Sequence, residues 1–225
     1  MKLAVIMVTH ARPAMLKRCI DSLCTVEGDY ESFVFALKDG SAESERCIEM
    51  GLSYCKAGWI DRLIVEPKSP CLFETFRRGI DYALAGGMVG GFLLTADDYE
   101  YKPTWYESLT KVLAVSEKNR ISHLTLNVEP DFAWNKIRSE EDINGVHVRM
   151  RDTIPGANWA MTRLAWRRMR TVYQNNELSP VLDHYINKEM RHDGYQLGAI
   201  DEAEHAGALH STCGNMAYQA AEVAQ

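Results

Sequence analysis

The sequence contains no C-x-x-C pair, although it has six cysteines in 225 residues. Three of them, Cys19, Cys47 and Cys55, fall inside predicted helices at core positions, where cysteine packs as a small hydrophobic residue. Scattered cysteines of this kind argue against a disulfide framework and indicate a reducing compartment. We therefore expect a cytoplasmic protein.

Long apolar runs are also absent. The longest uninterrupted runs, such as Leu3–Val8, have the length of a strand, which argues against a segment that spans a membrane. The N-terminal "MKLAVIMVTHARP" has a short apolar part, a His-Ala-Arg directly after it and no small-residue cleavage site. We interpret it as a first strand and not as a signal peptide.

Positive charge is in deficit, with 25 Lys and Arg against 31 Asp and Glu and a net charge of −6. This balance argues against general affinity for nucleic acid. The segment 162–170, "TRLAWRRMR", is a local exception. Its arginines could contact a phosphate backbone. They could equally form the solvent face of a helix, since Leu164, Trp166 and Met169 alternate with them, and this second interpretation is favoured.

What the sequence does contain is an alternation of strand and helix patterns. Apolar, β-branched runs predict strands, and apolar residues at helical spacing predict the helices between them. The predicted strands are 3–8, 32–41, 61–66, 91–96 and 122–127, and the helices begin near residues 13, 43, 72 and 103, the last running to about 118. This order predicts an α/β fold with a mostly parallel central sheet and helices on both faces.

The second half of the chain has a mixed pattern. It predicts a strand beside a hairpin at 143–152, a strand or strand-to-helix join at 156–163, helices at 163–174 and 180–192, and a short strand at 195–201. The sequence has no repeat and no obvious linker, so we predict one domain over residues 1–225.

Polar residues follow three of the predicted strands. They are Thr9 to Arg12, Lys38 to Ser41, and Asp97 with Asp98. Ligands bind at the carboxyl ends of strands in folds of this class. Two adjacent acids after an apolar strand are compatible with a simple turn, and also with a divalent cation that compensates their charge.

Several segments, in order, resemble glycosyltransferases of the GT-A fold and family-2 type. They are "VIMVTHARPAMLKRCIDSL" (5–23), "LKDGS" (37–41) and "LLTADDYEYKPTWYESL" (93–109). The last resembles the metal motif of that family, especially in the N-acetylglucosaminyltransferase I group. Two positions depart from the pattern: Lys38 replaces the first acid of Asp-Asp-Gly-Ser, and Ala96 stands where the group has Glu.

Three later segments extend this resemblance over roughly residues 3–210. "PGANWAMTRLAWRRM" (155–169) is similar to a Pro-Gly-x-x-Trp segment beside donor and acceptor, and "PVLDHYINKEMRHDGYQ" (180–196) to the helix that carries the catalytic base. "AEHAG" (203–207) is similar to a C-terminal His-x-Gly that contacts metal or diphosphate.

The resemblance implies a donor half at about 1–127 and an acceptor half at about 128–225. In the donor half it implies that Asp98 binds Mn²⁺ or Mg²⁺ and that Asp97 contacts the donor. It also implies a base pocket formed by Asp39 with Thr9, Ala11 and Arg12, and a contact of Arg77 and Arg78 with base or diphosphate. For the second half it implies Asp183 as catalytic base, Gly156, Asn158 and Trp159 at the acceptor, and His205 as a metal ligand with His210 as the alternative.

The expected function is therefore a metal-dependent, inverting glycosyltransferase that moves a hexosyl or N-acetylhexosaminyl group from a UDP-sugar. The acceptor is open between a saccharide and a modified base in DNA. One alternative is a sugar-nucleotide nucleotidyltransferase, which "THARPAML" disfavours because it has no glycine after the first strand. The other is a non-catalytic nucleotide- or sugar-binding module on the same fold.

Overall fold

The structure is a computed structural model of the 225-residue chain. It describes residues 1–67, 72–87, 89–128, 136–154, 158–176 and 182–206. Gly156 and His210, two of the predicted site residues, lie outside these ranges.

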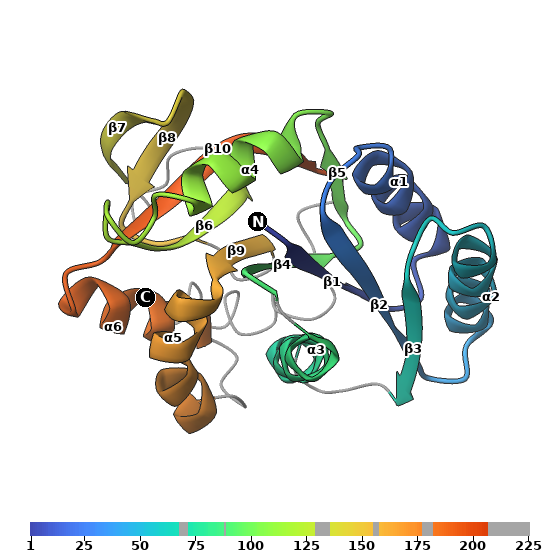
Figure 1. Cartoon of the computed structure of the whole chain (residues 1–225). Helices are drawn as coiled ribbons and strands as arrows, with labels where there is room; N and C mark the ends of the chain where they lie inside the picture. The colour runs from blue at the N-terminus through green and yellow to red at the C-terminus, as the bar shows by residue number, and fades with distance from the viewer. Residues whose placement is uncertain (68–71, 88, 129–135, 155–157, 177–181, 207–225) are drawn as a thin grey trace, which may run out of the picture.

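One twisted sheet runs through the molecule (Figure 1). Its order is β3-β2-β1-β4-β9-β6-β10-β8-β7, and β5 pairs with β10 beside this path. The strands are β1 (Leu3–Thr9), β2 (Tyr30–Lys38), β3 (Arg62–Pro67), β4 (Gly91–Ala96), β5 (Tyr99–Tyr101), β6 (Ile121–Asn127), β7 (Ile137–Ile143), β8 (Val146–Arg151), β9 (Asn158–Thr162) and β10 (Gln196–His205).

The first four strands form the parallel half of the sheet. β1 pairs in parallel with β2 and β4, and β2 with β3, as the strand and helix alternation predicted. β9 then lies antiparallel between β4 and β6. Since β9 comes from the second half of the chain, the two halves share one sheet.

Helices cover both faces of the sheet. They are α1 (Pro13–Cys24), α2 (Ala42–Lys56), α3 (Leu72–Gly86), α4 (Trp105–Leu113), α5 (Arg163–Asn176) and α6 (Leu182–His192). Buried side chains of α1, α2 and α4 belong to one apolar cluster, and those of α3, α5 and α6 to the other. This two-layered core confirms the predicted α/β architecture.

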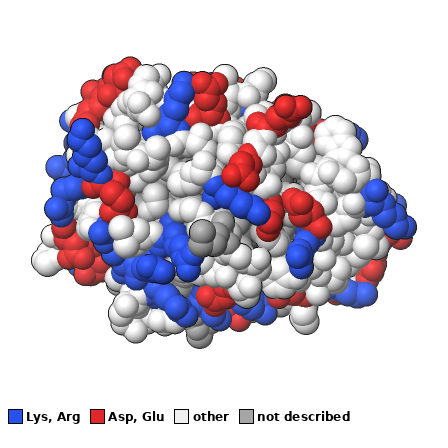
Figure 2. Space-filling model, viewed as in Figure 1, with Lys and Arg blue, Asp and Glu red and all other residues white. Residues whose placement is uncertain are grey.

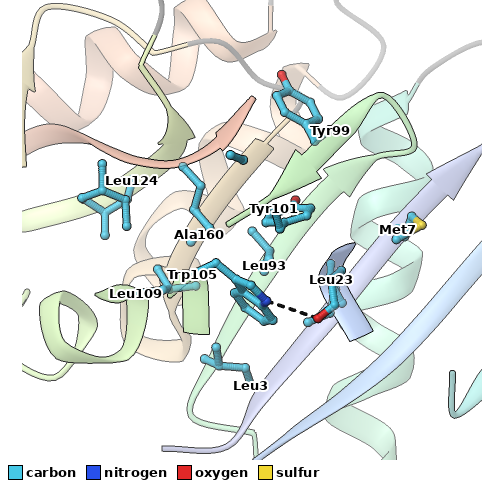
Figure 3. Close-up of a cluster of buried hydrophobic side chains, with 14 of the residues drawn as sticks. Leu3, Met7, Leu23, Leu93, Tyr99, Tyr101, Trp105, Leu109, Leu124 and Ala160 are labelled. Atoms are coloured by element: carbon cyan, nitrogen blue, oxygen red, sulfur yellow. Dashed lines mark hydrogen bonds between the residues drawn. The ribbon is translucent and has the colours of Figure 1, made fainter. Parts of the chain in front are cut away.

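Trp105 lies in the first of these clusters. Its buried indole is surrounded by Leu93, Tyr101 and Leu109, and its Nε1 donates a hydrogen bond to the Leu23 carbonyl oxygen at 3.2 Å (Figure 3). A buried indole with its N–H satisfied is a stable core element. Here it joins α4 to the end of α1.

Three elements differ from the sequence prediction. The helix after Pro103 ends at Leu113, before the predicted 118, and turns fill the segment up to β6. The short strand predicted at 195–201 continues to His205, and β5 was not predicted as a strand. β5 and the end of β10 stabilise each other by antiparallel pairing, which neither short segment signals on its own.

The hairpin of the second half does have a local signal. β7 and β8 are joined by Asn144 and Gly145, which both have positive φ, 56° and 80°. Asn-Gly is the preferred pair for a two-residue hairpin turn of this kind. The predicted hairpin is thereby confirmed.

In the basic segment 162–170, Thr162 ends β9 and residues 163–170 form the start of α5. Trp166 and Met169 are buried in the core, whereas Arg167 and Arg170 are exposed. Lys and Arg side chains gather over this part of the face in Figure 2. The helix therefore has an apolar inner face and a basic solvent face, the alternative favoured above.

Four of the six cysteines lie in the described part of the chain. Cys19 and Cys47 are buried and free, and Cys24 and Cys55 are free and half-buried. In the described part of the chain, no helix is both long enough and apolar enough to cross a bilayer.

Candidate functional site

The candidate site lies where β1, β2 and β4 end side by side. Val8 is in register with Ala96 on one side and with Phe35 on the other, so the residues after each strand meet at one edge. The backbone N–H of Asp97 donates to the Val8 carbonyl oxygen at 3.1 Å, which fixes the two acids against the end of β1. This confirms that the three polar strand ends lie on one edge of the sheet.

Asp97 is buried at the end of β4, only 1% exposed. Thr9 Oγ1 donates a hydrogen bond to its Oδ2 at 2.6 Å, and the Arg12 guanidinium forms an ion pair with its Oδ1. Burial nevertheless outweighs these partners and raises the pKa of Asp97 to about 6.

Asp98 is also buried, 3% exposed, but its surroundings favour the charged form. Arg12 Nη1 donates to its Oδ2 at 2.8 Å, and His205 Nε2 lies 3.4 Å from the same oxygen. Burial opposes ionisation of Asp98, but the hydrogen bond from His205 and the charge of Arg12 outweigh it and lower the pKa. Asp98 Oδ1 is buried and has no hydrogen-bond partner among the described residues.

Arg12 reaches both acids because of the backbone between β1 and α1. Ala11 has a φ of 52°, in the left-handed region, and the Arg12 carbonyl oxygen then accepts the first helical hydrogen bonds of α1 from Met15 and Leu16. A left-handed alanine costs roughly 1 kcal/mol. This sharp turn places the Arg12 side chain over the end of β4.

His205 is the last residue of β10 and is opposite Tyr99 of β5. The two rings lie 5.2 Å apart, and the N–H of Ala206 donates to the Asp98 carbonyl oxygen at 2.7 Å. The predicted neighbourhood of His205 and Asp98 is therefore present. It depends on the pairing of Tyr99 with His205, which the sequence did not predict because β5 is only three residues long.

Asp39 lies on the same edge, after β2. The Ser41 hydroxyl and N–H donate to its Oδ1 at 2.7 and 2.9 Å, and His10 Nε2 lies 2.8 Å from its Oδ2. The hydrogen bonds from Ser41, followed by that of His10, hold the pKa of Asp39 well below its usual range. His10 therefore bridges the ends of β1 and β2.

The two arginines of α3 that were predicted to contact the nucleotide-sugar each lie beside a carboxylate. Arg77 Nη1 lies 3.1 Å from Asp81 Oδ2, one turn along the helix. Arg78 Nη2 lies 3.0 Å from Glu66 Oε2 at the end of β3. The Arg78 contact ties α3 to the parallel half of the sheet.

The two residues of β9 that were predicted at the acceptor lie in different environments. Asn158 is in register with Thr95, beside the end of β4, and its Oδ1 lies 3.4 Å from the Tyr101 hydroxyl. Trp159 is 1% exposed, and its ring lies 4.6 Å from His123 and 5.8 Å from Phe73. Trp159 is thus a core residue, and we do not retain it as an acceptor contact.

Asp183, the predicted base, lies in the first turn of α6 and is half-buried. Its Oδ1 accepts a hydrogen bond from the His184 N–H at 2.9 Å. A carboxylate at a helix N-terminus is favoured by the helix dipole, so this position is also compatible with a helix-capping role.

The donor groups around Asp98 suit a hard divalent cation shared with a ligand. Within the described ranges, no three His, Cys, Asp or Glu side chains are arranged to hold a metal by themselves. Mg²⁺ sites, however, commonly use one or two carboxylates together with substrate phosphates and water. Asp98, with one unpartnered buried oxygen and with His205 beside it, fits such a partial site.

No family model matches the sequence, and no curated protein matches it. Solved structures do resemble the fold. The structure of GalNAc-T7 with UDP, GalNAc and Mn²⁺ superposes with a TM-score of 0.69 at 12% identity, over 93% of this chain and 44% of that chain. TarS 1–349 of S. aureus in complex with UDP-GlcNAc superposes with a TM-score of 0.54 at 11% identity, over 94% of this chain and 62% of that chain.

The present chain therefore spans less than two thirds of either neighbour. At such low identity the likeness establishes architecture alone. The chain has the fold of the GT-A glycosyltransferases.

Proposed function

We propose that this protein is a metal-dependent, inverting glycosyltransferase that takes its sugar from a UDP-sugar. The observation that carries the proposal is Asp98: a buried, ionised carboxylate with one unpartnered oxygen, beside His205, at the carboxyl edge of a GT-A sheet. The solved neighbours with this fold contain UDP with Mn²⁺, or UDP-GlcNAc.

In this proposal, Asp98 and His205 hold Mn²⁺ or Mg²⁺, which supplies a Lewis acid for the diphosphate leaving group when bound. Asp97 contacts the donor. Asp39 accepts a hydrogen bond from the uracil N–H, and the backbone of Thr9 and Ala11 lies beside the base. Arg77 and Arg78 leave their present carboxylate partners and contact the base or diphosphate of the UDP-sugar.

The second half of the chain, from about residue 128, then provides the acceptor side. Asp183 accepts the proton of the acceptor hydroxyl as that oxygen attacks the anomeric carbon opposite the leaving nucleotide. The Asn158 amide, at the start of β9, borders the acceptor. The acceptor is a saccharide or a modified base in DNA, and mass spectrometry of products from both classes separates these two.

The donor half of the proposal is tested by thermal denaturation with a panel of nucleotides, with and without Mn²⁺. A ligand at one hundred times its Kd stabilises the folded state by roughly 2.7 kcal/mol. We expect stabilisation by UDP that requires Mn²⁺ in the wild type and is lost in Asp98→Asn. Glu100→Gln is the matched control, since it removes an acid two residues away that forms an exposed ion pair with Arg18. Stabilisation by UDP and Mn²⁺ that persists in Asp98→Asn contradicts the proposal.

The role of Asp183 is separable from donor binding. We expect Asp183→Asn to retain the stabilisation by UDP and Mn²⁺ and to lower sugar transfer by roughly 10²–10⁴-fold, since only proton removal is impaired. Asp193→Asn, an exposed acid just beyond the same helix, serves as control. Equal transfer rates in Asp183→Asn and wild type would assign the base to another residue.

A further inference from the structure

The Arg12 guanidinium already occupies the place of a cation at the two acids. One of its nitrogens pairs with Asp97 Oδ1 and another lies 2.8 Å from Asp98 Oδ2, so a single side chain bridges both carboxylates. The sequence resemblance had placed Arg12 in the base pocket. The structure instead directs its charge at the acids.

The acids need such a partner. Both are buried, they are adjacent in sequence, and the negative charge of Asp98 disfavours ionisation of Asp97. A buried carboxylate without a compensating charge is strongly unfavourable. Arg12 therefore stabilises the site in the absence of any other cation.

The same contact conflicts with a divalent cation on Asp98. A metal ion on Asp98 and a guanidinium 2.8 Å from the same carboxylate are two cations only a few ångströms apart, and they repel strongly at a partly buried position. Arg12 can leave, because its side chain is 28% exposed and belongs to the short turn after Ala11. A diphosphate offers the guanidinium a bidentate partner.

We propose that Arg12 is a displaceable internal counter-cation that makes metal binding depend on the nucleotide. Without nucleotide, Arg12 holds Asp97 and Asp98 and keeps the affinity for Mn²⁺ low. With a nucleoside diphosphate present, Arg12 transfers to the phosphates and Asp98 becomes available to the metal. This inference rests on the proposed function, since it requires the metal and the diphosphate to share the site.

The test is the affinity for Mn²⁺ alone, measured from the electron paramagnetic resonance signal of the free ion. We expect Arg12→Gln to bind Mn²⁺ in the absence of nucleotide at least about tenfold more tightly than the wild type, because the competing charge is gone. Arg12→Lys, which keeps a cation at this place, should stay close to the wild type. Arg18→Gln, which removes an exposed arginine of the same helix, is the matched control.

A second measurement uses the reciprocity of coupled binding. The factor by which UDP increases the affinity for Mn²⁺ must equal the factor by which Mn²⁺ increases the affinity for UDP. We expect this factor to be smaller in Arg12→Gln than in the wild type, since part of the coupling comes from removal of Arg12. Thermal denaturation with and without Mn²⁺ shows whether Arg12→Gln is folded. If it is not folded, the same coupling factor is compared between Arg12→Lys and the wild type.

The outcomes separate this inference from the proposed function. If the wild type binds Mn²⁺ with UDP, and Arg12→Gln binds Mn²⁺ alone no more tightly than the wild type, the role of Arg12 is wrong and the metal site stands. If neither protein binds Mn²⁺ even with UDP, the metal site itself is wrong, and the inference falls with it.

Discussion

Asp97 and Asp98 are adjacent residues of one type whose environments differ. Asp97 points into the end of the sheet beside Thr9, and burial raises its pKa to about 6. Asp98 faces Arg12 and His205, and its pKa is lowered. A pair of titrating groups with separated pKa values is a feature of functional sites, because the two carboxylates can then have different roles.

The raised pKa of Asp97 predicts a pH dependence of stability. The folded state binds the Asp97 proton more tightly than the unfolded state, whose carboxyl has its usual pKa of 3.8. This contribution to stability is therefore present at low pH and is lost as the pH rises from about 4 to about 6. In Asp97→Asn the side chain is neutral at every pH.

We expect Asp97→Asn to be more stable than the wild type at pH 8, by roughly 3 kcal/mol. The difference should shrink toward pH 4.5. Urea denaturation between pH 4.5 and 8 measures it. If the free energy of unfolding changes with pH in the same way in the two proteins, the pKa of Asp97 is not raised by folding.

At the scale of elements, helix α3 packs closely against the strand that leads to the site. A Cβ on Gly79 would lie 2.4 Å from Ile6 Cγ2 and 3.1 Å from Phe35 Cε2. Alanine is favoured over glycine in a helix by about 1 kcal/mol when space allows. Here the glycine serves the approach of α3 to β1 and β2.

We predict that Gly79→Ala destabilises the protein by roughly 1–3 kcal/mol, through overpacking against β1. The matched control is Gly86→Ala in the same helix, where a Cβ would meet no atom within 4 Å. That control should be neutral or slightly stabilising. Chemical denaturation of both variants measures the contrast, and equal effects would mean that Ile6 moves aside at little cost.

At the scale of the whole molecule, the two halves of the chain are parts of one sheet. β9, from the second half, lies between β4 and β6 of the first half, and β10 pairs with β5, β6 and β8. Neither half has a closed sheet of its own. The candidate site uses both, since Asp98 follows β4 and His205 ends β10.

This topology predicts a single cooperative unfolding transition. Trp105 is buried in one apolar layer, and Trp159 and Trp166 in the other. Tryptophan fluorescence and far-ultraviolet circular dichroism should therefore report the same midpoint in urea. Two separated transitions would show that the donor and acceptor halves unfold independently.

Local signals in the sequence were enough to predict many of the helices and strands of this protein. The apolar runs of β1 and β4, the Asn144-Gly145 turn and the helical spacing in α1 depend on neighbours along the chain, and the structure confirms the elements that they predicted. The convergence of polar strand ends also followed from sequence, because parallel strands place their carboxyl ends at one edge.

Pairings between distant segments were decided only by the tertiary structure. The insertion of β9 buries Trp159, the pairing of β5 with β10 brings His205 to Asp98, and the turn at Ala11 directs Arg12 onto both acids. Each of these contacts joins residues whose local patterns are compatible with several partners. Which partner is chosen depends on how the sheet closes and which charges become buried together, and these are properties of the folded chain as a whole.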